Sequence, residues 1–133
     1  MAARRAIQLD PKNAGGYGAL AALLTANGKW AEAEDLFKQA LTLDPNAPDV
    51  LSSYANMLTT LGRLKESLHI REKVRMLEPL VPNYVADVAS SLRVNGQPAA
   101  AIPILEAIPG RSIALAGAYA AVGRYNDAAD TLL

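Results

Sequence analysis

The sequence predicts an all-α fold built from repeated pairs of antiparallel helices. First, a Leu-Asp-Pro or Leu-Glu-Pro motif recurs every 34 residues, at residues 9–11, 43–45 and 77–79. Second, the apolar residues between these motifs recur three and four positions apart, which is the spacing of one face of an α-helix. Third, glycines that can end a helix keep the same interval, at Gly28, Gly62 and Gly96. Repeats of this length are helix pairs that bury their apolar faces against neighbouring repeats.

The same interval relates small, apolar and helix-breaking residues along the chain. Equivalent positions hold Ala21, Ala55 and Ala89; Leu24, Leu58 and Leu92; Ala33, Ser67 and Ala101; Ala6, Ala40 and Val74; and Pro48 and Pro82. A chance alignment of so many residue types is very improbable. We therefore predict that the chain is an array of similar structural units.

In the first complete unit, a helix is predicted over about residues 13–27. It ends at Gly28, because glycine adopts the left-handed conformation of a helix C-cap without steric cost. A second helix is predicted from about Trp30 to the residues before Pro45, which cannot donate a backbone hydrogen bond and restricts its predecessor. Pro48 then suits the first turn of the next helix. The two apolar faces hold Tyr17, Leu20, Ala21 and Leu24, and then Ala33, Leu36, Phe37, Ala40 and Leu41.

After Gly96 the interval changes from 34 to 27 residues, so that Gly96 corresponds to Gly123. Pro103 is predicted to kink or fray its helix, and Pro109-Gly110 predicts an early turn. We therefore predict a shortened repeat unit and a local bend in the array at this point. The expected divisions are a closing helix of an incomplete repeat at 1–12, units at 13–46 and 47–80, a shortened third unit at 81–108 and a truncated fourth unit at 109–133. Since neither end shows the polar cap that such arrays need, we expect a fragment of a larger protein.

The first unit resembles the tetratricopeptide repeat (TPR) in its residues Tyr17, Leu20, Ala21, Leu24, Gly28, Ala33, Phe37, Ala40 and Pro45. In the second unit the resemblance is weaker, with Arg71 where a phenylalanine is expected. The resemblance implies a right-handed α-solenoid, or TPR superhelix, of about nine helices, whose usual role is to bind proteins.

Composition excludes several classes of partner. Thirteen basic and thirteen acidic residues give no net charge, so that neither nucleic acid nor a membrane surface is an expected partner. The longest apolar runs are too short to cross a bilayer. The absence of cysteine excludes disulfides and thiolate metal sites, and leaves the cellular compartment undecided.

No catalytic, cofactor or metal site is predicted. His69 is the only histidine, and no cysteine or paired acidic cluster accompanies it as acid–base chemistry would require. The glycines never form a phosphate-binding run. A basic stretch within residues 63–75 is interleaved with glutamates, which indicates a solvated outer helix face.

The resemblance also implies which positions face the concave groove of the array. The candidate groove residues are Gly15, Gly18, Ala22, Thr25, Asp49, Ser52, Ser53, Asn56, Thr59, Asn83, Asp87, Ser90 and Arg93; the remaining positions are Ala19, Ala26, Thr60, Ala86, Val94, Gly110, Ile113, Ala114, Gly117, Ala120 and Ala121. Such a groove lets a peptide backbone come close and hydrogen-bond to amides and hydroxyls. It lacks the basic clamp of some family members, because Gly18 and Ala22 stand where lysine and asparagine are needed. The alternative is that these small residues only permit helix packing.

Three functions are consistent with this pattern. The first is a scaffold that binds a protein or peptide partner in the groove, and no motif identifies that partner. The second is an accessory segment of a larger enzyme, since residues 77–102 resemble the TPR tails of bacterial nucleotide cyclases and related signalling proteins. The third is self-association to a homodimer through uncapped apolar ends.

Overall fold

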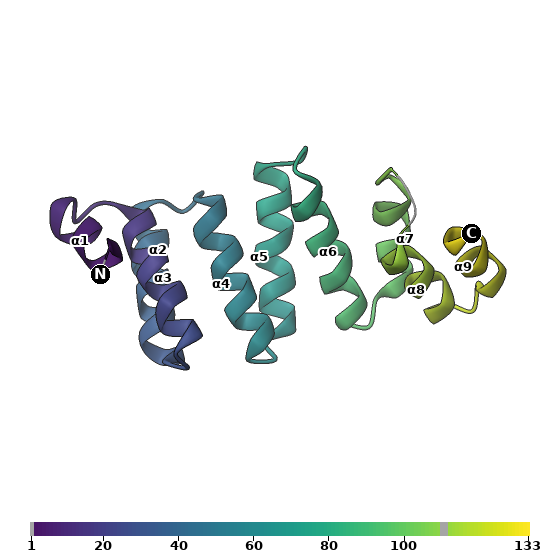
Figure 1. Ribbon diagram of the computed structural model, residues 1–133, viewed down its shortest axis with the longest axis horizontal. Helices are drawn as coiled ribbons and strands as arrows, with labels where there is room; N and C mark the ends of the chain where they lie inside the picture. Colours follow the sequence, from purple (N-terminus) through teal and green to yellow (C-terminus); the bar gives the residue numbers. More distant parts are fainter. Residues whose placement is uncertain (1, 110–111) are drawn as a thin grey trace. The chain divides into compact units, whose positions relative to one another are not determined.

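The computed structural model describes residues 2–109 and 112–133, and this part of the chain consists of helices joined by short turns, without a strand (Figure 1). Its nine helices are α1 (Ala2–Leu9), α2 (Ala14–Ala26), α3 (Trp30–Leu43), α4 (Pro48–Thr60), α5 (Leu64–Leu77), α6 (Pro82–Val94), α7 (Pro98–Glu106), α8 (Ile113–Ala121) and α9 (Tyr125–Leu132). The predicted all-α fold is confirmed. No helix in this described part has both the length and the apolar character of a membrane span. The chain divides into two compact units, Met1–Ile70 and Arg71–Leu133.

Four glycines end helices as the repeat interval predicts. Gly28, Gly62, Gly96 and Gly123 have φ angles of 75°, 79°, 77° and 82°. In each case the next residue donates its backbone N–H back to the preceding helix; for example, Lys29 N lies 2.9 Å from the carbonyl oxygen of Leu24. This hydrogen bond is the mark of a Schellman motif, which satisfies a free carbonyl at the helix end. The glycines therefore set the tight turn inside each helix pair.

The Leu-Asp-Pro motifs form the turns between helix pairs. Asp10 Oδ1 accepts a hydrogen bond from Lys12 N at 3.1 Å, and Asp44 Oδ1 accepts one from Asn46 N at the same distance. These side-chain bonds stabilise the turn around each proline. Pro48 begins the next helix, where its missing N–H leaves no hydrogen bond unmade.

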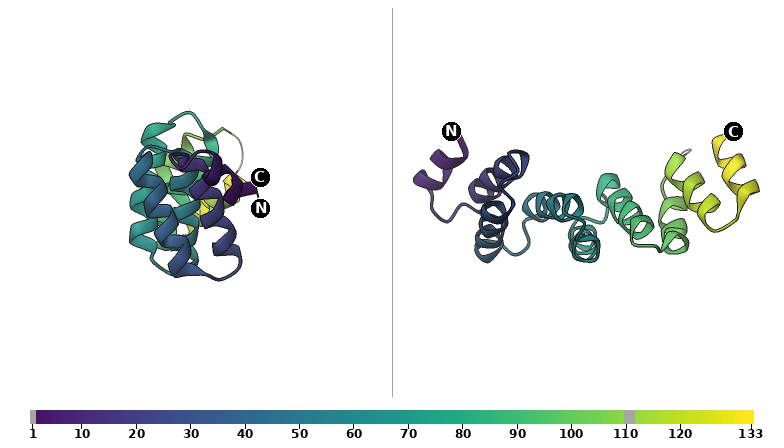
Figure 2. Two further views of the ribbon diagram at one scale, coloured as in Figure 1. Left: turned by 90° about the vertical axis from the view of Figure 1, so that its left-hand side faces the viewer. Right: turned by 90° about the horizontal axis from the view of Figure 1, so that it is seen from below.

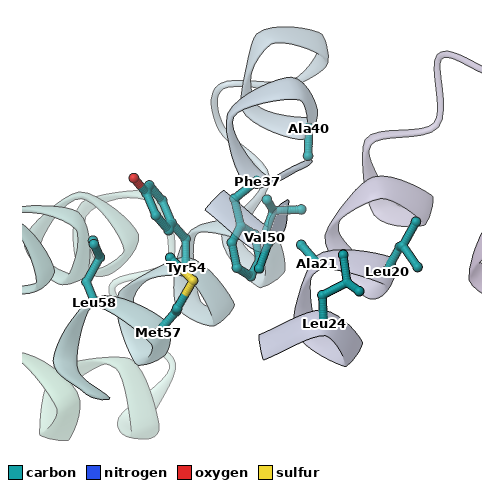
Figure 3. Close-up of a cluster of buried hydrophobic side chains, with 10 residues drawn as sticks. Leu20, Ala21, Leu24, Phe37, Ala40, Val50, Tyr54, Met57 and Leu58 are labelled. Carbon is teal, nitrogen blue, oxygen red and sulfur yellow. The ribbon is translucent and has the colours of Figure 1, made fainter. Parts of the chain in front are cut away.

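The first compact unit contains α1 to α4 and the first half of α5. In Figure 1 and in the right-hand view of Figure 2, α2 lies beside α3 as an antiparallel neighbour. The core between α2, α3 and α4 consists of Leu20, Ala21, Leu24, Ala33, Phe37, Ala40, Val50, Tyr54, Met57 and Leu58 (Figure 3). The rings of Phe37 and Tyr54 stack with centroids 5.3 Å apart. Ala21, Ala33 and Ala40 are fully buried, which shows that small residues let the helices approach.

The second compact unit contains the second half of α5 and the helices α6 to α9. α7 has 9 residues where α3 has 14. Pro103 lies inside α7, which ends three residues later at Glu106. Ser112 caps α8 by accepting a hydrogen bond from Leu115 N at 3.1 Å. The predicted turn at Pro109 extends to Gly110, which lies outside the described residues.

Candidate functional site

A hollow of about 280 Å³ lies between α2 and α4 in the first unit. We call it the α2–α4 hollow, and its lining residues are Gly15, Gly18, Ala19 and Ala22 from α2 and Asp49, Val50 and Ser53 from α4. Six of these seven occupy positions that the family resemblance assigns to the groove. Val50 is the exception, because its position in the repeat belongs to the core and it is buried. It forms part of the hollow because the residue facing it from α2 is a glycine.

Close packing of α2 against α4 creates the floor of this hollow. A Cβ atom built on Gly18 would lie 2.8 Å from Val50 Cγ2, closer than real side chains approach. The absence of a side chain at Gly18 therefore lets the two helices come together. Because Gly15 and Ala22 on the same helix are also small, the surface stays open to an approaching main chain.

Asp49 is the only ionisable residue that lines the hollow. It lies in the first turn of α4, where a carboxylate interacts favourably with the helix dipole. No ion pair joins Asp49 to a cation within the described residues. Ser53 adds a hydroxyl on the same helix. The hollow is thus mostly apolar, with one negative charge and one hydroxyl group at its edge.

The two candidate groove threonines of the first compact unit, on α2 and α4, already use their hydroxyl protons. Thr25 Oγ1 donates to the carbonyl oxygen of Ala21 at 2.9 Å, and Thr59 Oγ1 donates to that of Ala55 at 3.0 Å. Such bonds to the preceding helical turn are typical of threonine within helices. The Thr25 hydroxyl remains an acceptor, whereas the Thr59 hydroxyl is also hydrogen-bonded to Ser67 Oγ at 2.6 Å. Asn56 is exposed on α4, and Ser52 is half-buried there.

The candidate groove residues of the second compact unit lie on α6. Asn83 and Ser90 are exposed. Asp87 pairs with Arg71 of α5, whose Nη1 lies 3.2 Å from Asp87 Oδ2. This pair accounts for the departure at Arg71 from the expected phenylalanine, because the position is mostly buried and the carboxylate compensates its charge. Arg93 extends from α6 toward α8.

A polar network joins α3, α4 and the start of α5 next to the stacked rings. Tyr54 Oη and Arg63 Nη1 both donate to Glu34 Oε2 at 2.7 Å. Arg63 also forms two hydrogen bonds to Glu66, at 2.9 Å and 2.7 Å. The hydrogen bond from Tyr54 lowers the pKa of Glu34, with Arg63 adding to the effect. Burial, together with the Glu34 carboxylate, raises the pKa of Tyr54 to about 12. Spacing along the chain did not reveal this network, since its members come from three helices.

The described residues contain no group of three or more histidine, cysteine, aspartate or glutamate side chains that could hold a metal ion. His69 is exposed on α5. A larger hollow of about 430 Å³ lies at the end of α5, lined by Glu72, Arg75, Met76 and Pro79. None of these residues occupies a groove position of the repeat.

Two tetratricopeptide repeat family models match the sequence, one over residues 24–86 and one over residues 2–35. Their matches overlap and together extend from residue 2 to residue 86, the part that holds the regular 34-residue units. The chain belongs to the tetratricopeptide repeat family. A comparison with curated proteins gives no match.

Solved TPR structures share the fold. The structure of YrrB, described as a TPR protein with an unusual peptide-binding site, matches with a TM-score of 0.85 and 20% identity, over 98% of this chain and 71% of that one. A chain of the Naa15/Naa10 complex bound to HypK-THB matches with a TM-score of 0.77 and 27% identity, over 98% of this chain. PilF of Pseudomonas aeruginosa matches with a TM-score of 0.82 and 20% identity, over 97% of this chain. This TPR chain spans 21% of the matched Naa15/Naa10 chain and 62% of PilF.

Proposed function

We propose that this TPR chain is a protein-interaction scaffold that holds a peptide or helix of its partner in the α2–α4 hollow. The observation that carries the proposal is the lining of the hollow, in which residues with little or no side chain from α2 face Asp49 and Ser53 of α4. Such a surface lets a peptide backbone come close, while two polar groups orient it.

The chemistry of the site favours binding over catalysis. The hollow has a single carboxylate and no histidine or lysine, so that it offers no pair of groups for proton transfer. Two structural relatives are in accord with a binding role, since one is described as having a peptide-binding site and the other as bound to HypK-THB.

The proposal is tested by filling the hollow. Short random peptides displayed on phage are selected on the immobilised wild-type chain, and the enriched peptides are synthesised and titrated by fluorescence anisotropy. Ala22→Trp places an indole in the hollow and should weaken binding at least about tenfold, because the ring occupies the space of the peptide backbone. The matched control is Ala31→Trp, which adds the same ring to an exposed position on α3. Equal affinity for the wild type and Ala22→Trp would refute binding in the hollow.

Self-association is a second candidate function, because α9 exposes large apolar side chains. Tyr125 is 70% exposed and Leu132 is 56% exposed. Apolar surface of this kind favours contact with another protein, including a second copy. Sedimentation velocity over a dilution series tests it: a single monomeric species at all concentrations would exclude a homodimer.

A further inference from the structure

The guanidinium group of Arg93 lies against the backbone of α8 at Gly117. A Cβ atom built on Gly117 would lie 3.0 Å from Arg93 Nη2 and 3.6 Å from Arg93 Cζ. The glycine therefore lets the planar group from the last turn of α6 approach the neighbouring helix closely. An arginine held in this way loses less conformational freedom when it binds a ligand than one extended into solvent.

Arg93 has no carboxylate partner within the part of the chain that the structure describes. By contrast, Arg63, Arg71 and Arg124 each pair with an acidic side chain, at 2.7 Å, 3.2 Å and 2.7 Å respectively. Asp87, the acidic groove residue on the same helix as Arg93, is paired with Arg71. Among the described residues no carboxylate therefore competes with an external acceptor for the N–H donors of Arg93.

Two exposed apolar residues occupy positions next to Arg93 on α6 and one turn from Gly117 on α8. Ile113 is 84% exposed and precedes Gly117 by one turn on the same face of α8. Val94 is 58% exposed and follows Arg93 on α6. We call these two residues, together with Arg93 and Gly117, the Arg93 surface. It combines a positive charge with two exposed apolar side chains.

We propose that the Arg93 surface binds a partner segment that carries an aspartate or glutamate close to an apolar side chain. We choose an acidic partner because of charge complementarity, since a guanidinium forms two parallel hydrogen bonds with a carboxylate. Ile113 and Val94 receive the apolar side chain next to it. In an extended segment, residues two apart lie on one face, so that alternate positions can reach the arginine and the isoleucine together. This inference rests on the proposed function, since it assumes a peptide ligand, but it concerns a different set of residues.

The test uses the peptides selected on the wild-type chain. They should be enriched in aspartate and glutamate relative to the starting library, next to leucine, isoleucine or valine. The most enriched acidic peptide and its glutamine-for-glutamate counterpart are then titrated against the wild type, Arg93→Gln, Arg93→Lys and the control Arg75→Gln, which removes an arginine of α5. Circular dichroism melting verifies that each variant is folded.

We expect Arg93→Gln to weaken binding of the acidic peptide about fivefold, the range of an exposed ion pair. The same substitution should leave binding of the glutamine peptide unchanged, because the two changes remove the same interaction. Arg93→Lys should retain part of the affinity, and Arg75→Gln should retain all of it. Selected peptides without an acidic excess, or an equal loss with both peptides, would overturn the proposal. If Arg93→Gln weakens peptide binding and Ala22→Trp does not, binding in the α2–α4 hollow is refuted and binding at the Arg93 surface is supported. If Ala22→Trp weakens peptide binding and Arg93→Gln does not, binding at the Arg93 surface is refuted and binding in the hollow is supported.

Discussion

Gly18→Ala tests whether close packing between α2 and α4 shapes the hollow. The added methyl group would lie 2.8 Å from Val50 Cγ2, whereas carbon atoms pack best at about 3.5–4.0 Å. Relieving this contact requires a shift of roughly 1 Å, and overpacking of this kind costs about 1–3 kcal/mol. In a helix interior, alanine is also more favourable than glycine by about 1 kcal/mol. The net result should be a loss of stability of about 0–2 kcal/mol.

A double-mutant cycle with Val50→Ala separates the two contributions. In the Val50→Ala background the clash is gone, so that Gly18→Ala should stabilise by about 1 kcal/mol through helix propensity alone. Gly117→Ala is the matched control within a helix, because there the new methyl meets only the flexible end of Arg93, and it should also stabilise. Urea unfolding with the m-value fitted separately for each variant gives the free energies of unfolding. If Gly18→Ala stabilises equally in both backgrounds, the packing argument is wrong.

Two further predictions concern a turn and the polar network. Gly28→Ala should lower the free energy of unfolding by about 1–2 kcal/mol, because φ is 75° while no atom crowds the new Cβ; Gly28→Asn should lose less in the same urea assay, and an equal loss would contradict the backbone explanation. Tyr54→Phe should destabilise by about 1–2 kcal/mol at neutral pH, because it removes a hydrogen bond to the Glu34 carboxylate. Since the pKa of Glu34 is lowered from 4.5 in the folded chain, this stabilisation is present above pH 4.5 and is lost as the pH falls below it. The difference between wild type and Tyr54→Phe should therefore shrink in acid, and a constant difference from pH 3 to pH 7 in urea unfolding would show that Glu34 is not the partner.

Helix ends and repeat units were predictable because they depend on local backbone chemistry. Gly28 ends its helix in the left-handed conformation, and Pro48 begins the next one, as expected from the preferences of single residues. The 34-residue interval placed Gly62 and Gly96 in the same role. The hollow was predictable in part, since Gly18 and Asp49 occupy groove positions, but the contribution of Val50 was not.

The order of residues along the chain was therefore enough to establish the helix pairs, their turns, the family and the lack of a recognisable catalytic motif. Tertiary structure alone decided which residues meet between helices when they are 16 to 24 positions apart in sequence. The hydrogen bond from Tyr54 to Glu34, the pairing of Arg71 with Asp87 and the contact of Arg93 with Gly117 are of this kind. The physical reason is that helix ends depend on one or two neighbouring residues, whereas these contacts depend on how closely two helices approach and on which rotamers fill the space between them.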